Sequence, residues 1–505
     1  MKYLVHLVLV VFWCTVAAAD PAPLEAPETA NEILRDFNTA WDEENWENLI
    51  DAGRRLTAHP LFEQQDTEFR FFITIRYGFG QFNTENYQAA LALFDTAETL
   101  SDDHAIVHYF RYITQIELES WANAFADFVD LSEENPDLFS DIRLNRVFAG
   151  LNGLRDSGDD LLHRQMLDLA LTRYEPESPF STLDFMRVRR ANLLIEDGDN
   201  DAAREIIEAI IVPSALSRIR TDRDFDVFWN RDWFESVTNA RMSHEAYLNH
   251  LNDLIAEHPL DLSGRHSRVQ ILAGLGRLEE AENEARSAHD ELTSGTPFSD
   301  ADEYATWLLN EWAYILYALG RIDEADAIME RSMELAEGRS LNVSQTINYG
   351  ALLISQARYQ EGLDTLDLME DRSASSYGDM WVWSGRVCGN HHLGNLAVRD
   401  TYLSRMSDGW DDNPAAYQRA LICTNMTDEA AALMIRRLEH PSHRDGALQA
   451  LQRLTPLHSI PEFENSQRWA AAVDALAERE DIQRALEPVG RIETHDILSI
   501  YWGEY

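Results

Sequence analysis

The stretch EWAYILYALGRIDEADAIMERSMELA, residues 311–336, has apolar residues at a helical period on both sides of one short polar break. Ala313 and Ala325 lie twelve residues apart, Met329 follows four residues later, and Ser332 follows three after that. Small residues at the first two positions let two antiparallel helices approach closely, while the large apolar residue fills the space against the next pair. The stretch therefore predicts a helical hairpin.

Altered copies of this hairpin frame recur along the chain. They lie at residues 76–100, 112–136, 191–210, 270–288 and 348–369. The spacing between copies is irregular: 34 residues separate Ala90 from Ala124, and 44 separate Ala281 from Ala325. Repetition at such a period is typical of a solenoid, in which inserted residues fall in loops.

The frame resembles the tetratricopeptide repeat, a family of paired antiparallel helices. The resemblance implies an all-α solenoid of helical hairpins. It also implies protein or peptide partners that bind a concave surface lined by the first helix of each pair. Because one fold serves many functions, the resemblance does not identify the partner.

We expect two tetratricopeptide-like arrays with an irregular connector between them. The arrays cover residues 28–212 and 243–440, and the frame is weakest at 140–180. Residues 213–242 break the frame and are expected to pack as a connector between the arrays. Its aromatic residues are Phe225, Phe228, Trp229, Trp233 and Phe234. Residues 441–505 are expected to form a helical cap on the last hairpin.

The first residues predict export. Residues 1–19 contain a lysine, an apolar run and an A-x-A arrangement, which together are typical of a secretory signal peptide, and residues 20–27 form a short linker. No later apolar run approaches the length of about 20 residues that a spanning helix needs. We therefore expect an exported protein without an integral membrane segment after cleavage, periplasmic in a bacterial cell envelope or, alternatively, extracellular.

Acidic residues dominate the charge of the chain. There are 88 Asp and Glu against 42 Lys and Arg, a net charge of −46. This balance argues against nucleic acid and is expected of a highly solvated surface in a salty or oxidising exterior. A protein or peptide partner with basic flanks is the alternative explanation. Lys2 is the only lysine, so every other basic side chain apart from histidine is an arginine. Chemistry that needs a P-loop or Schiff-base lysine is thereby excluded from residues 3–505.

One stretch has the carboxylate spacing of a calcium loop. Asp197, Asp199 and Asp201 alternate, and Glu208 is the twelfth residue from Asp197. However, the hairpin frame begins a helix near Asp201, which would tie up the backbone that has to wrap an ion. We therefore predict a solvated turn and no metal site.

Catalytic motifs are missing from the sequence. It contains neither a G-x-S-x-G nor a G-x-G-x-x-G pattern, so we expect no cofactor and no enzyme activity. Cys388 and Cys423 are 35 residues apart, close to one repeat, which leaves both a disulfide and two free thiols open.

The resemblance implies that the first helices of the hairpins line a groove that binds the partner. The candidate residues are Phe72, Ile75, Phe79, Trp307, Asn310, Tyr314, Tyr317, Trp381 and His391. Each aromatic residue could instead be core between hairpins. The sequence thus favours a scaffold or adaptor for protein or peptide partners. A carbohydrate-binding envelope protein, or an enzyme with its chemistry in the non-repeat segments, is the alternative.

Overall fold

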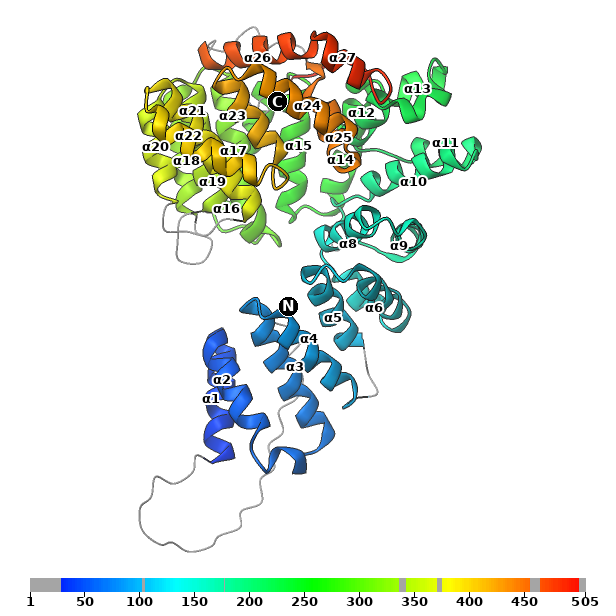
Figure 1. Ribbon diagram of the computed structural model, residues 1–505, viewed down its shortest axis with the longest axis vertical. Coiled ribbons are helices and arrows are strands. Elements are labelled where there is room, and N and C mark those ends of the chain that lie inside the picture. Colours follow the sequence, from blue (N-terminus) through cyan, green and yellow to red (C-terminus); the bar gives the residue numbers. More distant parts are fainter. Residues whose placement is uncertain are drawn as a thin grey trace, which may run out of the picture. The chain divides into compact units, whose positions relative to one another are not determined.

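The structure is a computed structural model that describes residues 29–101, 105–176, 178–335, 342–369, 375–454 and 464–498 (Figure 1). The predicted signal peptide and linker, residues 1–27, lie outside these residues. The described chain forms an all-α repeat fold of helical hairpins, as the sequence predicts. It divides into two compact units, residues 1–139 and 140–505. None of the described helices combines the length and the hydrophobicity needed to cross a membrane.

The first unit consists of hairpins stacked in sequence order. Its elements are α1 (Ala30–Asp42), α2 (Trp46–Thr57), η1 (Phe62–Gln64), α3 (Thr67–Asn83), α4 (Tyr87–Glu98), α5 (Ala105–Glu117), α6 (Trp121–Glu134) and, at its end, α7 (Pro136–Ser140). A capping box starts α1, because the Glu32 amide donates to Thr29 Oγ1 and the Thr29 amide donates to Glu32 Oε2. Phe94 is fully buried and stacks on Phe110 with ring centroids 5.3 Å apart.

The second unit contains the other hairpins. Its helices are α8 (Leu144–Asp156), α9 (Asp160–Arg173), α10 (Asp184–Glu196), α11 (Asn200–Glu208), α12 (Pro213–Thr221), η2 (Arg223–Phe228), α13 (Asp232–Val237), α14 (Ala240–Glu257), α15 (Leu262–Gly274), α16 (Leu278–Thr293), α17 (Ala301–Ala318), α18 (Ile322–Glu334), α19 (Val343–Ser355), α20 (Tyr359–Asp367), α21 (Ser376–His392), α22 (Leu396–Asp408), α23 (Pro414–Cys423), α24 (Thr427–Glu439), α25 (Pro441–Ala450), α26 (Glu464–Ala477) and α27 (Glu480–Leu486). Two short strands, β1 (Arg453–Leu454) and β2 (Thr494–His495), pair in parallel.

Close helix packing explains the small residues of the frame. Ala313, Ala325 and Met329 are fully buried in one cluster, as predicted. Between α19 and α20 the approach is closer still, because a Cβ at Gly362 would lie 2.8 Å from the carbonyl oxygen of Gly350. Only glycine fits at such a distance.

The turns inside the hairpins share one residue in the left-handed region, two positions before the first residue of the second helix. In the described chain these residues are Glu44, Glu85, Glu119, Gly158, Gly198, Gly276, Gly320, Ala357, Gly394 and Asn425. Gly198 has φ of 81°, and the Asp199 side chain then accepts from the Ala202 amide at 3.2 Å to start α11. The predicted solvated turn at this stretch is confirmed.

An arginine follows the left-handed residue in three of these turns and forms an ion-pair ladder. Arg277, Arg321 and Arg358 each donate two hydrogen bonds to a glutamate three residues later. Arg321 also lies 3.3 Å from Glu282 of the preceding hairpin, and Arg358 lies 2.5 Å from Asp326. Glu282 additionally pairs with Arg286 on the same helix. The ladder therefore links consecutive hairpins as well as closing each turn.

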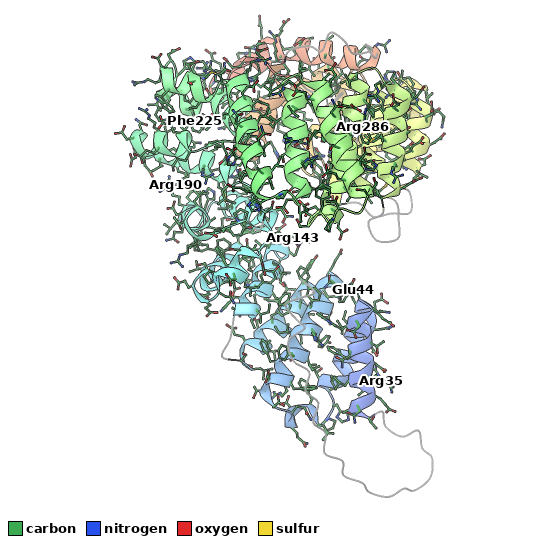
Figure 2. The ribbon with its side chains drawn as sticks, turned by 180° about the vertical axis from the view of Figure 1, so that it is seen from behind. Arg35, Glu44, Arg143, Arg190, Phe225 and Arg286 are labelled. Carbon is green, nitrogen blue, oxygen red and sulfur yellow. A yellow bond between two sulfur atoms is a disulfide. The ribbon has the colours of Figure 1, made fainter. Side chains whose placement is uncertain are left out.

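The aromatic connector forms a core with the hairpin before it. Phe225 and Phe234 are buried with side chains of α10, α11 and α12 (Figure 2). Asp184 at the start of α10 accepts from the amides of Ile211 and Val212, both at 2.8 Å. The connector is thus continuous with α10 and α11.

The compact units divide after residue 139, whereas the sequence-based arrays divide at 212. The weakly patterned residues 140–180 form the hairpin of α8 and α9. The difference has a physical cause: the core described above crosses position 212 without a break.

The C-terminal segment returns to the connector and closes the second unit. Asp222 forms a β-bridge with Gly490, and the Arg491 amide donates to the Thr221 carbonyl at 3.0 Å. Helix α25 lies against α12 (Figure 1). The C-terminal segment therefore joins parts of the second unit that are distant in the sequence.

Candidate functional site

The structure divides the predicted groove residues into exposed and buried ones. Phe72 is 36% exposed and Trp307 is 38% exposed, so both can meet a partner. The side chains of Ile75, Asn310, Tyr314 and Tyr317 are buried. Buried side chains present no surface to a partner. These four residues therefore do not line an open groove, contrary to the prediction.

The burial of three of these residues follows from the position of α17. This helix packs against α15, α16 and α18. Asn310 accepts from Asn348 of α19 at 3.1 Å, and the Tyr317 hydroxyl donates to Asp326 of α18. Helical periodicity identifies the face toward the partner helix, but it does not show that neighbouring hairpins cover the other faces as well.

Phe79, Trp381 and His391 are half-buried. Phe79 packs among Trp41, Trp46 and Phe110, with ring centroids 5.5 to 5.6 Å apart. It therefore belongs mainly to the core of the first unit. Trp381 and His391 do not line a cavity, but each contacts a residue that does: Trp381 lies near Arg419, and His391 packs edge-on against His392.

This cavity, of about 210 Å³, lies where the ends of α19, α21 and α23 meet α26. Its walls combine apolar and polar side chains: Ile354, Ser355, Cys388, His392, Arg419, Ile422, Cys423, Asn425, Arg468, Trp469 and Ala472. Three first helices and the C-terminal segment therefore build one site. We refer to it as the α26 pocket.

The described lining of the α26 pocket contains two arginines, although the chain is strongly acidic. Arg419 and Arg468 line it, and none of its described lining residues is acidic. The Arg419 guanidinium carbon lies 6.0 Å from the ring centroids of both Trp381 and Trp469. Both rings lie within the range at which an aromatic face attracts a guanidinium through cation–π interaction. Such a site suits a ligand with an apolar or aromatic body and a negative group.

A disulfide between Cys388 and Cys423 forms part of the wall. Their Cα atoms are 5.7 Å apart, so the disulfide joins α21 to α23. His392 stacks on Tyr359 with ring centroids 4.5 Å apart, and its Nε2 lies 3.8 Å from Cys423 Sγ. Of the two alternatives left by the sequence, the structure has the disulfide.

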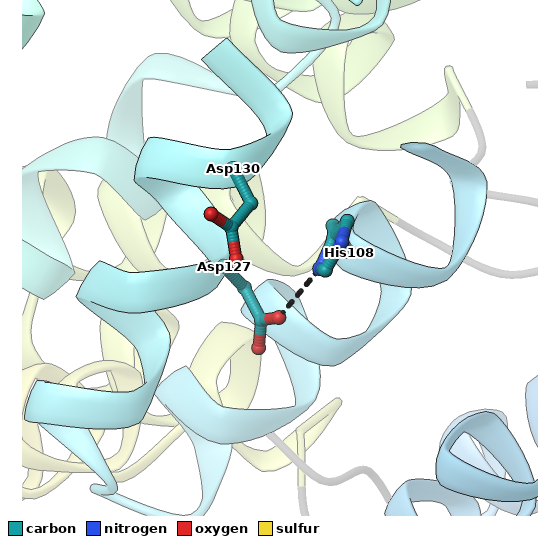
Figure 3. A group of neighbouring side chains, drawn as sticks. All are labelled: His108, Asp127 and Asp130. Atoms are coloured by element: carbon teal, nitrogen blue, oxygen red, sulfur yellow. Dashed lines mark hydrogen bonds and ion pairs between the residues drawn. The ribbon is translucent and has the colours of Figure 1, made fainter. Parts of the chain in front are cut away.

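A second polar cluster lies between α5 and α6 in the first unit (Figure 3). His108, Asp127 and Asp130 come close enough together to be considered as metal ligands. The Asp127 carboxylate, however, receives His108 Nδ1 at 2.8 Å, Gln115 Nε2 at 2.8 Å and Arg111 Nε at 3.3 Å. Burial raises the pKa of Asp127, against the hydrogen bonds from His108 and Arg111.

These contacts make the cluster a poor cation site. Both carboxylate oxygens of Asp127 already accept hydrogen bonds, and a bound cation would lie beside the Arg111 guanidinium. The chemistry of the group fits a structural network that ties α5 to α6.

Reasoning from sequence missed most of the α26 pocket. The only available signal was the separation of the two cysteines by one repeat length. Arg419, Arg468 and Trp469 lie outside the hairpin frame or on its unassigned faces, so their convergence depends on how α26 folds back.

Comparisons with known proteins give fold-level neighbours only. Neither a family model nor a curated protein matches the sequence. Among solved structures, yeast Tom70 is 12% identical, with 83% of this chain and 94% of that chain covered and a TM-score of 0.32. The Cut9–Hcn1 assembly of the APC/C is 12% identical, with 92% and 96% covered and a TM-score of 0.28. The TPR domain of P58(IPK) is 12% identical, with 91% and 98% covered and a TM-score of 0.20.

Proposed function

We propose that this protein is an exported scaffold that binds a protein or peptide partner, and that the α26 pocket seats one side chain of that partner. The cavity carries the proposal, because it combines apolar walls, two indole rings nearby and two guanidinium groups. Arginine and tryptophan are the residues that most often dominate binding energy at protein interfaces.

The charge distribution restricts the kind of segment that the partner can present. The net charge of −46 favours basic flanking residues, whereas the pocket itself favours an acidic or aromatic anchor. We therefore expect a segment whose anchor residue differs in charge from its surroundings. Such a segment would find its register through the pocket.

The proposal includes the cellular location of the protein, which is outside the cytoplasm. The signal-peptide pattern of residues 1–19 and the disulfide both support an oxidising compartment outside the cytoplasm, in a bacterium the periplasm.

A binding experiment with two arginine variants tests the proposal. The full protein captures partners from periplasmic extract, and the binding segment of each identified partner is then measured by fluorescence anisotropy. Arg419→Met is expected to weaken binding at least tenfold, since it removes a guanidinium that lines the pocket and lies near two indoles. Arg405→Met, which removes an arginine beside Tyr402 on α22, is the matched control.

Equal affinity of the Arg419→Met variant and the unaltered protein would contradict a role for the pocket. Binding of free glycans without any protein partner would favour the carbohydrate-binding alternative instead.

A further inference from the structure

We propose that the Cys388–Cys423 disulfide is a thiol–disulfide exchange site, with Cys423 as the sulfur that forms the mixed disulfide with an external thiol. The inference does not depend on which partner the scaffold binds. It rests on where the two sulfurs lie and on what surrounds them.

The two cysteines differ in access. Both line the α26 pocket, but Cys388 is only 4% exposed, whereas Cys423 is partly exposed. An external thiolate entering the pocket therefore meets the Cys423 sulfur first. Thiol–disulfide exchange requires access of this kind to the attacked sulfur.

The surroundings of Cys423 favour the charged form of its sulfur. His392 Nε2 lies 3.8 Å from Cys423 Sγ, and the stacking of His392 on Tyr359 holds the ring in that position. Arg419 and Arg468 line the same cavity. Reactive cysteines occur in such electropositive, partly exposed surroundings, because the thiolate is the reacting species.

The exchange can be written with atoms and electrons balanced. A thiolate RS⁻ attacks Cys423 Sγ, the S–S bond to Cys388 breaks, and Cys388 leaves as a thiolate that takes up a proton. A second thiolate then attacks the R sulfur of the mixed disulfide and releases Cys423. The external thiols are oxidised to RSSR, and both cysteines are reduced. His392 beside Cys423 stabilises this leaving thiolate, and the reverse sequence oxidises the pair again.

The chemical class of the reactant is a thiol whose CH2–SH end can enter a cavity of about 210 Å³, either on a small molecule or on a cysteine in a flexible segment of a partner. Glutathione represents the first source and a cysteine-containing peptide the second. The two sources are distinguished by measuring the exchange rate at increasing concentrations of glutathione and of the peptide. Only a peptide that binds before it reacts would show a rate that saturates.

The first test starts from the protein with its disulfide formed. Reduced glutathione is added to the folded full-length protein, and intact mass after acid quenching gives the rate of mixed-disulfide formation and reduction. His392→Gln is expected to slow release of Cys423 about tenfold. The control His258→Gln alters an exposed histidine that lies 4.0 Å from Asp261 and does not line the pocket, and is expected to leave the rate unchanged.

The second test identifies the reacting sulfur. Oxidised glutathione is added to Cys388→Ser and Cys423→Ser, after circular dichroism has verified the fold of each. The Cys388→Ser protein is expected to form its adduct at least tenfold faster than the Cys423→Ser protein. Equal adduct rates, or identical behaviour of the two histidine variants, would overturn the proposal and leave a purely structural disulfide.

Discussion

The two units differ in how they form the same turn. In the first unit, Glu44, Glu85 and Glu119 take the left-handed conformation, with φ between 54° and 61°. In the second unit, glycine takes that position in most turns, for example Gly198 and Gly320. A side chain in this region costs about 1 to 2 kcal/mol, whereas glycine adopts it freely. The first unit is therefore built from more strained hairpins.

The units also differ in how their ends are held. In the first unit the main helix contacts join neighbours in the sequence. In the second unit, Arg155 of α8 donates to Ser442 of α25 across 287 positions at 2.9 Å, and the Asp222–Gly490 bridge adds a further long-range link. Arrays with only nearest-neighbour contacts lose stability locally, whereas closure couples distant hairpins. This comparison leads to four predictions.

The largest effect is expected from matched core truncations. Phe94→Ala in the first unit should cost about 3–5 kcal/mol, and Met329→Ala at the same frame position in the second unit about 2–5 kcal/mol. Hydrogen exchange measures how far each effect spreads. Phe94→Ala should raise exchange in α3–α6 alone, and Met329→Ala across α12–α27. If increased exchange extended equally far from the substitution in both units, closure would not couple the distant hairpins of the second unit.

Closure itself can be broken at Gly490. A Cβ there would clash with Leu448 and lie 3.1 Å from the Thr221 carbonyl oxygen, so Gly490→Ala should lower the free energy of unfolding of the second unit by about 1–3 kcal/mol in urea. The control is Gly446→Ala in the nearby α25, where the nearest atom is 3.5 Å away. If both variants unfold at the same urea concentration, the bridge contributes nothing.

Acid should weaken the second unit through His163. Burial lowers the pKa of His163 to about 4, with further lowering by Arg189 and Arg155. The unfolded chain, with a pKa of about 6.5, then binds more protons between pH 6.5 and 4, so the free energy of unfolding falls as the pH falls through that window.

His163→Gln removes this contribution. It should reduce the loss of stability between pH 6.5 and 5 by up to about 2 kcal/mol, as measured by urea unfolding at both values. The exposed His258, changed to Gln, provides the control. An unaltered pH dependence in His163→Gln would show that other groups cause the acid sensitivity.

The smallest effect concerns the turns. Glu85→Gly should raise the melting temperature of the first unit, with a gain of about 0.5–1 kcal/mol. Gly198→Ala should cost about 1 kcal/mol through the backbone alone, because no atom lies within 4 Å of the added Cβ. If both variants gained stability, or both lost it, the first unit would not be the one with the more strained turns.

The sequence predicted the repeating parts of the fold and little of what is built between repeats. The frame of Ala313, Ala325 and Met329 became a buried hairpin core because helical spacing directly encodes which residues face the partner helix. The same spacing placed Tyr314 and Tyr317 on a groove, yet both are buried. Local periodicity contains no information on how neighbouring hairpins enclose a helix.

The pocket shows the same limit more strongly. Its wall combines residues of α19, α21, α23 and α26, so it depends on the C-terminal segment returning to the array. The spacing of Cys388 and Cys423 allowed a disulfide but could not decide the direction in which each side chain points. Such long-range placement follows from the summed packing of many helices.

The arginine ladder has a consequence for alkaline solution. Its cations, Arg277, Arg321 and Arg358, belong to a chain whose only lysine is Lys2. A lysine would lose half its charge near pH 10.4, whereas arginine remains protonated to beyond about pH 12. The links between these hairpins should therefore persist in base, and reagents that modify lysine amines would find no side chain on the ladder.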